Sequence, residues 1–201
     1  MAVLASHGGS ILQAIMDACR AGELPAKVVL VIGNNSGSLA LRRAANAGLA
    51  SLHLSSRTHP DPDALDRAIC DALVEVRADW VMLAGYMKKL GNETLAAFPR
   101  RILNTHPALL PKFGGRGFYG RKVHQAVIDA GESESGATVH LVDADYDTGP
   151  TVSQVRVPVL PDDAVEDLEQ RVQTAERVLV VDTLRDLVFG RISTGSVVGD
   201  A

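Results

Sequence analysis

The sequence predicts an α/β fold: an open, mostly parallel, Rossmann-like sheet of about seven strands flanked by helices, with antiparallel strands toward the C-terminal part. Short runs rich in Val and Leu alternate with longer helical patterns through residues 1–100. This rhythm is typical of crossover connections and of a parallel sheet covered on both faces. With 201 residues and no internal repeat, the chain is expected to form a single domain over residues 1–201 that buries roughly 70% of its unfolded surface.

Four strand–helix pairs are expected in residues 1–100. Each strand is a short apolar run, and each helix repeats apolar residues every three to four positions. Together they predict a Rossmann-like half of the domain. In order, the pairs are AVLAS with ILQAIMDACRA, KVVLVIG with SLALRRAANAG, LASLHL with PDALDRAICDALVEV, and DWVMLAG with NETLAAF.

Residues 101–201 follow a different pattern. RILNT (101–105) predicts a further strand, and after an irregular stretch YGRKVHQAVIDAG predicts a helix. ATVHLVDA and TVSQVRVPVL alternate polar and apolar residues in part, which favours antiparallel and partly exposed strands. A long helix from about Ala164 to Phe189 closes the predicted fold.

The composition excludes several classes of protein. Lys and Arg total 20 against 24 Asp and Glu, and the formal charge of −4 argues against nucleic acid or an anionic membrane as a partner. Cys19 and Cys70 are too few for a disulfide framework or a structural zinc site, so a reducing cytoplasm is the expected location. The sequence has no signal-peptide pattern and no apolar run of the roughly 18 residues that span a bilayer. We therefore expect a cytoplasmic protein in which any anionic ligand is held by local contacts.

The loops after the strands are the expected ligand site, because ligands of open α/β sheets bind at the carboxyl ends of the strands. SHGGS (6–10) follows the first strand and opens a helix, so its N–H groups and the helix's positive end would suit a phosphate. A tight turn that requires glycine explains the same residues equally well. The second strand runs into Asn34 and Asn35 instead of an acidic residue, which argues against a dinucleotide.

NTHP places Asn104 and His106 on the same side of a strand end. Pro107 restricts His106 to extended geometry, so the imidazole is held in place. Asn and His could bind a developing oxyanion and move a proton, whereas the alternative is a capped strand end whose polar side chains satisfy loop backbone. The basic and glycine-rich GGRGFYGRK that follows could contact phosphates, but a mobile lid is the preferred interpretation in an acidic protein.

DADYDTGP carries Asp143, Asp145 and Asp147. The spacing lacks the Gly and the distal Glu of a calcium loop, so metal binding is the lesser interpretation, and a solvated turn is the other alternative. A carboxylate facing His106 would raise the pKa of the imidazole above about 6.5 and make it a general acid near neutral pH. His140 either points to the same site or is a half-buried structural residue.

Five segments resemble, in the same order, those of the phosphoribosylglycinamide formyltransferases, the folate-dependent family of purine biosynthesis. The resemblance spans nearly the whole chain. It implies that a formyl group moves from 10-formyltetrahydrofolate, as co-substrate, to the amine of glycinamide ribonucleotide, without a metal. The segments are SHGGSILQAI, LAGYMKKL, LNTHPALLPKF, ATVHLVDADYDTGP and RVQTAE.

The resemblance also implies roles for individual residues. On this assignment residues 1–100 form a phosphate-binding half and residues 101–201 a catalytic and folate-binding half. The catalytic residues would be Asn104, His106 and Asp147. Glycinamide ribonucleotide would be bound by Gly9, Ser10, Ile11, Pro107, Gln173 and Glu176. The folate would be bound by Met87, Lys88, Lys89, Leu90, Asn104, Asp143, Ala144 and Asp145.

Three positions depart from the family pattern. Ile11 stands where the family usually has Asn, so phosphate contact there is left to backbone N–H groups. Lys88 replaces a frequent Arg and loses bidentate contact with a carboxylate. Pro62 aligns with an Arg that some members place before the third helix.

Other functions remain open on the same scaffold. They are hydrolysis of 10-formyltetrahydrofolate, formyl transfer to another amine, and a non-catalytic folate or nucleotide sensor. A turnover assay separates them, because a sensor causes no formyl loss and a hydrolase needs no amine. The oligomeric state is expected to be a monomer or a homodimer.

Overall fold

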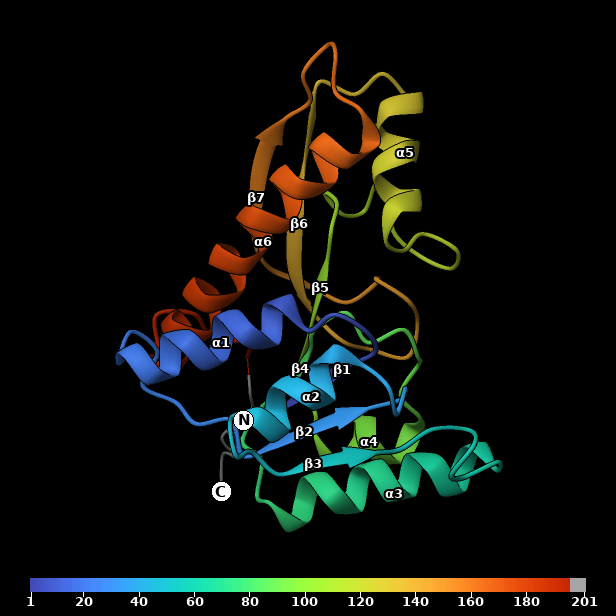
Figure 1. Cartoon of the computed structure of the whole chain (residues 1–201), viewed down its shortest axis with the longest axis vertical. Helices are drawn as coiled ribbons and strands as arrows, with labels where there is room; N and C mark the ends of the chain where they lie inside the picture. Colours follow the sequence, from blue (N-terminus) through green and yellow to red (C-terminus); the bar gives the residue numbers. More distant parts are fainter. Residues whose placement is uncertain (196–201) are drawn as a thin grey trace.

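A seven-stranded mixed sheet runs through the molecule in the computed structural model, which describes residues 1–195 (Figure 1). The strands are β1 (Ala2–Ala5), β2 (Leu30–Gly33), β3 (Ser51–His53), β4 (Val81–Leu83), β5 (Ile102–His106), β6 (Glu134–Leu141) and β7 (Thr151–Pro158). Their spatial order is β3-β2-β1-β4-β5-β6-β7. Neighbours are parallel from β3 through β5, whereas β5, β6 and β7 pair antiparallel. The predicted fold class is confirmed.

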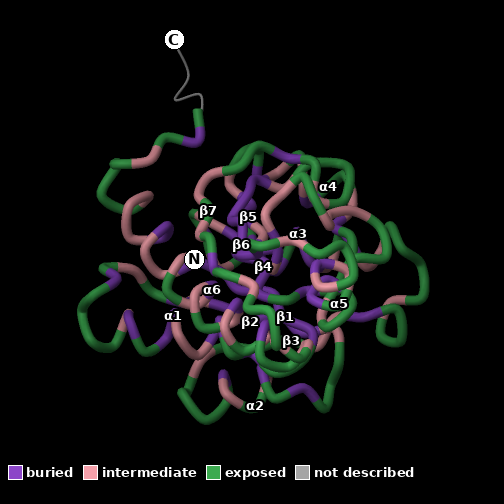
Figure 2. Tube along the Cα trace, turned by 90° about the horizontal axis from the view of Figure 1, so that it is seen from above, coloured by how far each residue is buried: buried purple, intermediate pink, exposed green. Residues whose placement is uncertain are grey.

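Helices cover both faces of this sheet, as predicted. Val3 and Ala5 of β1 belong to the same apolar cluster as Leu12, whereas Leu4 belongs with Leu73 to the cluster on the opposite face. Because successive side chains of a strand point to opposite faces, β1 is apolar at every position. Figure 2 shows the buried strands at the centre of the molecule, surrounded by exposed segments. The helices are α1 (Ser10–Ala21), α2 (Leu39–Asn46), α3 (Pro62–Glu75), α4 (Asn92–Ala97), α5 (Arg121–Asp129) and α6 (Val165–Val188).

Asp66 of α3 fixes the start of α4 and, with it, the loop that follows β4. Its carboxylate accepts hydrogen bonds from the backbone N–H groups of Gly91 at 2.9 Å, Glu93 at 2.8 Å and Thr94 at 3.3 Å. The first N–H groups of a helix have no partner within the helix, so a carboxylate there acts as a cap and complements the positive helix end. The carboxylate therefore supplies the cap that Gly91, which precedes α4, cannot provide.

One prediction about the C-terminal strands was wrong. β6 begins at Glu134, three residues before the predicted strand, and is buried from Ser135 to Leu141 instead of partly exposed. Its polar residues face protein: the Thr138 hydroxyl donates to the Ala108 carbonyl at 2.7 Å and accepts from the Leu110 N–H at 3.1 Å. Partial exposure holds for β7, because that strand forms the edge of the sheet.

Two further expectations concern membrane-spanning segments and the extent of the domain. Within residues 1–195, no helix combines the length and the apolar character needed to cross a bilayer. The predicted domain extends to residue 201, and residues 196–201 lie outside the described part.

Candidate active site

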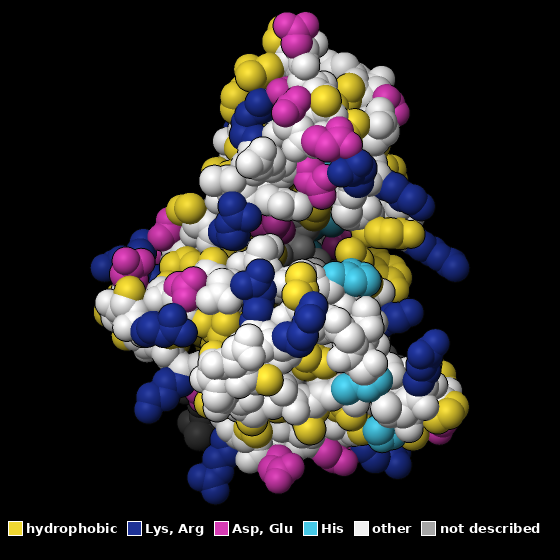
Figure 3. Space-filling view, in the orientation of Figure 1, with side chains coloured by type: hydrophobic (Ala, Val, Ile, Leu, Met, Phe, Trp, Pro, Cys, Tyr) yellow, Lys and Arg dark blue, Asp and Glu magenta, His cyan; other side chains and the backbone are white. Residues whose placement is uncertain are grey.

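A cavity of about 580 Å³ lies at the carboxyl ends of β1, β4 and β5. Its walls combine the loop from His7 to Ile11, the segments 84–87, 104–107 and 115–120, and one face of α6. Figure 3 shows the surface hollowed between the lower part of the molecule and the part above it that contains α5 and β7. A larger and more open groove of about 790 Å³ lies between β7 and α6, but it contains none of these loops.

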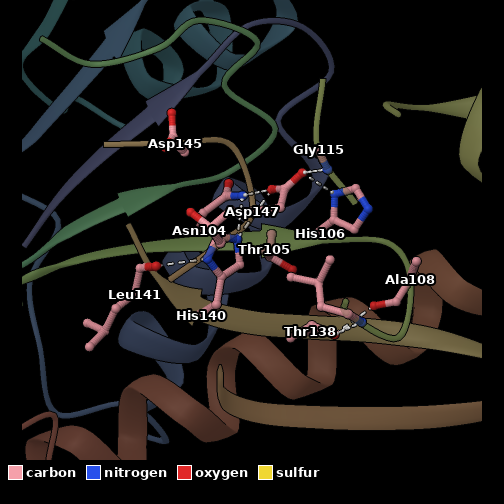
Figure 4. Close-up of polar contacts among 12 residues, drawn as sticks. Asn104, Thr105, His106, Ala108, Gly115, Thr138, His140, Leu141, Asp145 and Asp147 are labelled. Atoms are coloured by element: carbon pink, nitrogen blue, oxygen red, sulfur yellow. Dashed lines mark hydrogen bonds and ion pairs between the residues drawn. The ribbon is translucent and has the colours of Figure 1, made fainter. Parts of the chain in front are cut away.

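Asp147 lies at the centre of the polar contacts in this cavity (Figure 4). Its Oδ2 accepts a hydrogen bond from the Gly115 N–H at 2.9 Å and lies 3.5 Å from Nδ1 of His106. Its Oδ1 lies 3.4 Å from Asn104 Nδ2 and 3.4 Å from His140 Nε2. The structure thus brings the three predicted catalytic residues together and adds His140.

Asp147 is held in this position by its backbone and its neighbours. Its φ of 57° falls in the left-handed region, which Asp tolerates better than most residues and which is often found at functional sites. Burial acts to raise the pKa of Asp147, but its contacts with His140 and His106 and the hydrogen bond from the Gly115 N–H together hold that pKa below its ordinary value. The carboxylate is therefore ionised at neutral pH.

His106 has one ring nitrogen fixed by the backbone. Its Nε2 lies 2.7 Å from the Phe113 carbonyl, which can only accept, so we assign the proton of the neutral ring to Nε2. Nδ1 then presents a lone pair toward Asp147. Burial lowers the pKa of His106 below its ordinary value, although Asp147 and the Phe113 carbonyl act to raise it. The expected rise in pKa was wrong, because desolvation of this 4% exposed residue outweighs its partners.

His140 is a further residue of the site, for which the sequence left open a place in the site or a structural, half-buried role. It is paired opposite Asn104 in the β5–β6 register and is 2% exposed, not half-buried. Its Nδ1–H donates to the Leu141 carbonyl at 2.8 Å, so Nε2 is free to accept from Asn104 Nδ2 at 3.0 Å. Both hydrogens of the Asn104 amide thus have acceptors in the site, one on His140 and one on Asp147.

The opposite end of the cavity is built by the glycine loop after β1. Gly9 has φ 69°, and a Cβ at this position would lie 2.8 Å from Cα of Ala40, so glycine is required for the close approach of α2. Gly9, Ser10 and Ile11 all line the cavity, as predicted, at the uncapped start of α1. Arg43 of α2 braces the loop by donating to the Gly8 carbonyl at 3.0 Å. Free N–H groups and the positive helix end suit an anion here.

Known proteins are similar to this chain in both sequence and fold. The formyl transferase family model matches residues 1–184. The chain belongs to the formyl transferase family. It is 40% identical to a chloroplastic phosphoribosylglycinamide formyltransferase of Vigna unguiculata, over 96% of this chain and 62% of that protein, and 37% identical to the phosphoribosylglycinamide formyltransferase of Haemophilus influenzae, over 96% and 88%. It thus spans less than two thirds of the Vigna protein.

Solved structures agree with this assignment to the formyl transferase family. The glycinamide ribonucleotide transformylase 1 of Symbiobacterium toebii superposes with a TM-score of 0.88 at 39% identity, covering 94% of this chain and 87% of that one. The phosphoribosylglycinamide formyltransferase of Bacillus halodurans gives 0.87 at 34% identity, covering 93% and 94%. The fold is therefore that of this family.

In this member of the formyl transferase family, α6 supplies a polar wall of the cavity. Glu169, Gln173 and Glu176 all line it, because positions i, i+4 and i+7 share one helix face. Gln173 and Glu176 were predicted, and the helical period could also have revealed Glu169. Glu169 accepts from Gln173 Nε2 at 3.1 Å, and buried Glu176 accepts from the Thr105 hydroxyl at 2.9 Å. Burial raises the pKa of Glu176 to about 7.

The predicted folate residues are only partly brought to the cavity. Met87 and Asn104 line it, as does Pro107 of the predicted acceptor site. Leu90 is buried in the apolar core, and Asp143 stabilises its own loop by accepting from Thr148. The residues predicted for folate that do not line the cavity are Lys88, Lys89, Leu90, Asp143, Ala144 and Asp145.

The loops that carry these residues nevertheless meet beside the cavity. Lys89 Nζ lies 3.6 Å from Asp145 Oδ1 and 6.0 Å from the ring centre of Tyr146, which does line the cavity. A binding role for these loop residues therefore stays a prediction. Within residues 1–195, no group of three or more His, Cys, Asp or Glu side chains is arranged to hold a metal ion.

Proposed function

We propose that the chain is a phosphoribosylglycinamide formyltransferase, which transfers the formyl group of 10-formyltetrahydrofolate to the amine of glycinamide ribonucleotide in purine biosynthesis. The names of its relatives support this activity. The observation that carries the proposal is the contact of one ionised carboxylate, Asp147, with both Asn104 and His106 inside the cavity. A pure binding protein has no need of such a proton-transfer group.

The transfer passes through a tetrahedral intermediate. The acceptor nitrogen bonds to the formyl carbon, the carbonyl oxygen becomes an oxyanion, and the bond from that carbon to the folate nitrogen then breaks. The amine loses one proton and the folate nitrogen gains one, so the reaction needs a group that first accepts and later donates. Neutral His106 accepts at Nδ1, and the resulting imidazolium is stabilised by Asp147 at 3.5 Å. The positive charge of this imidazolium then stabilises the oxyanion, and the Asn104 amide can donate to it by giving up one of its present acceptors, His140 or Asp147.

The substrates fit opposite ends of the cavity. Gly9, Ser10 and Ile11 would bind the phosphate of glycinamide ribonucleotide through backbone N–H groups, with Pro107, Gln173 and Glu176 along the rest of the molecule. The folate would enter beside Met87 and Asn104, with Lys88, Lys89, Leu90 and residues 143–145 around its outer part. On this proposal residues 1–100 bind mainly phosphate, and residues 101–201 supply the catalytic residues. A monomeric or homodimeric state and a cytoplasmic location remain predictions.

A turnover assay tests the function. Purified protein is given 10-formyltetrahydrofolate with and without glycinamide ribonucleotide, and both folate and formylated ribonucleotide are measured. The proposal expects folate release only with the ribonucleotide, and one formylated ribonucleotide for each folate released. In His106→Ala, both the folate release and the formylated product should be lost. His59→Ala, on the loop before α3, is the matched control and should retain turnover. Release without the ribonucleotide would indicate a hydrolase, and no release would indicate a sensor.

A further inference from the structure

His124 is a buried polar residue at the cavity with no role in the function described so far. It belongs to α5, is 1% exposed, and contributes to the cavity wall. Among residues 1–195, its Nδ1 is buried without a hydrogen-bond partner. Three other buried side-chain atoms also lack one, on Asn34, His53 and Ser135, and none of those residues lines the cavity.

An unpaired buried nitrogen is costly, by about 1–3 kcal/mol, and most buried polar groups in proteins are paired. A polar group left unpaired at the wall of a ligand cavity can instead find its partner on the ligand. The segment in front of α5 can accommodate such a ligand. Gly115, Gly117 and Gly120 have positive φ and line the cavity, and no atom lies within 4 Å of a Cβ built on any of them, so these three positions face open space.

The surroundings of His124 indicate which chemical group would bind. Burial lowers its pKa, although the Glu169 carboxylate acts to raise it, so the ring is neutral near pH 7. Glu169 and Glu176 line the same cavity and disfavour an anion at this wall, whereas the start of α1 at the other end suits the phosphate. A hydroxyl both donates and accepts, so it can pair with the Nδ1 of neutral imidazole in either tautomer.

We propose that His124 binds a ribose hydroxyl of the acceptor substrate through Nδ1 and so helps to select a ribosyl over a deoxyribosyl acceptor. This inference rests on the proposed function, because it takes the acceptor to be a ribonucleotide amine. His124 acts in binding and does not exchange protons with the reacting atoms. Its contribution should therefore appear in the KM of the acceptor, with the KM of the folate unchanged.

The test compares glycinamide ribonucleotide with its 2′-deoxy and 3′-deoxy analogues as acceptors for the wild type and for His124→Leu. In the wild type, one of the two analogues should have a KM raised roughly 10-fold, as expected for a lost hydrogen bond. In His124→Leu, the KM for the ribonucleotide should rise by a similar factor, and the variant should no longer distinguish that analogue. His124→Asn, which keeps a polar atom near the position of Nδ1, should restore part of the discrimination.

Stability separates a binding role from a structural one. Because Nδ1 has no partner in the free protein, His124→Leu should keep the wild-type Tm or raise it. Ser135→Ala removes another unpaired buried group, away from the cavity, and is the matched control: its Tm should behave in the same way, and its acceptor KM should not change.

Three results would overturn the inference. They are a wild type indifferent to both deoxy analogues, a His124→Leu variant with wild-type discrimination, and a variant that loses Tm while its acceptor KM stays normal. A wild type that does not formylate the ribonucleotide at all would refute the proposed function and this inference together. Wild-type turnover with unchanged discrimination in the variant would refute the role of His124 alone.

Discussion

The imidazole of His106 and the carboxylate of Asp147 lie 3.5 Å apart, Nδ1 to Oδ2, with the opposite ring nitrogen of His106 held by the Phe113 carbonyl. A proton added to Nδ1 is therefore received directly in front of a negative charge. The free protein keeps the ring neutral by burial, and the neighbouring carboxylate limits the cost of protonating it. This pair can accept a proton from one substrate and return it to the other.

Replacing the carboxylate by an amide tests this relationship. Asp147→Asn keeps the size of the side chain but removes its charge, so the imidazolium loses the interaction that raises its pKa. We expect kcat to fall roughly 10²- to 10⁴-fold, the usual range for positioned acid–base groups, with the fold retained by circular dichroism. Asp162→Asn, an exposed substitution between β7 and α6, should leave kcat unchanged. A kcat within a few-fold of wild type in Asp147→Asn would refute the role of the pair.

Glu176→Gln tests the buried carboxyl on α6. The pKa of Glu176 is about 7 in the folded protein, against an ordinary value of 4.5, so the folded state retains the proton over this interval. Its stabilising contribution is complete below pH 4.5 and is lost as the pH rises through 7. Since Gln cannot ionise, the variant should gain stability over the wild type as the pH rises, by on the order of 2–3 kcal/mol.

Urea unfolding at pH 5 and at pH 8 provides the measurement for this change. The free energy of unfolding of the wild type should fall more between the two pH values than that of Glu176→Gln. The side-chain oxygen of Gln can also accept the hydrogen bond from Thr105. The two proteins therefore differ at this position only in whether the side chain can ionise. An equal pH dependence in the two proteins would mean that Glu176 is ionised normally in the folded state.

Gly9→Ala tests the glycine loop. Gly9 has φ 69°, and an added Cβ would meet the Cα of Ala40 at 2.8 Å, so the substitution adds a clash to the backbone strain. We expect a destabilisation of roughly 1–3 kcal/mol and a raised KM for the acceptor, because the loop must shift away from the proposed phosphate position. Gly22→Ala, at φ 77° with no atom within 4 Å of the added Cβ, is the control for strain alone. It should lose stability but keep the acceptor KM.

Much of this site could be predicted from the sequence because local pattern determines it. The alternation of strands and helices follows from apolar periodicity, and the strand–loop sequence NTHP places Asn104 and His106 on one side of β5. The pairing of His140 with Asn104 could not be predicted in the same way, since it depends on the antiparallel register between β5 and β6. A register is set by tertiary contacts, not by the residues of one strand.

The direction of the pKa of His106 was also beyond the sequence. The sequence indicates a possible carboxylate partner, but it does not indicate how deeply the ring is buried, and here burial has the larger effect. His124 illustrates the same limit. Its position on α5 is apparent from the helical pattern, whereas its place in the cavity wall depends on how α5 lies relative to the loops and to α6.

An NMR titration of the histidine ring nitrogens tests the central claim most directly. The account predicts that His106 in the wild type titrates below its ordinary pKa of 6.5 and that its neutral ring carries the proton on Nε2. It also predicts that Asp147→Asn lowers this pKa further. A His106 pKa above 6.5, or one that is unchanged by Asp147→Asn, would contradict the proposed proton transfer.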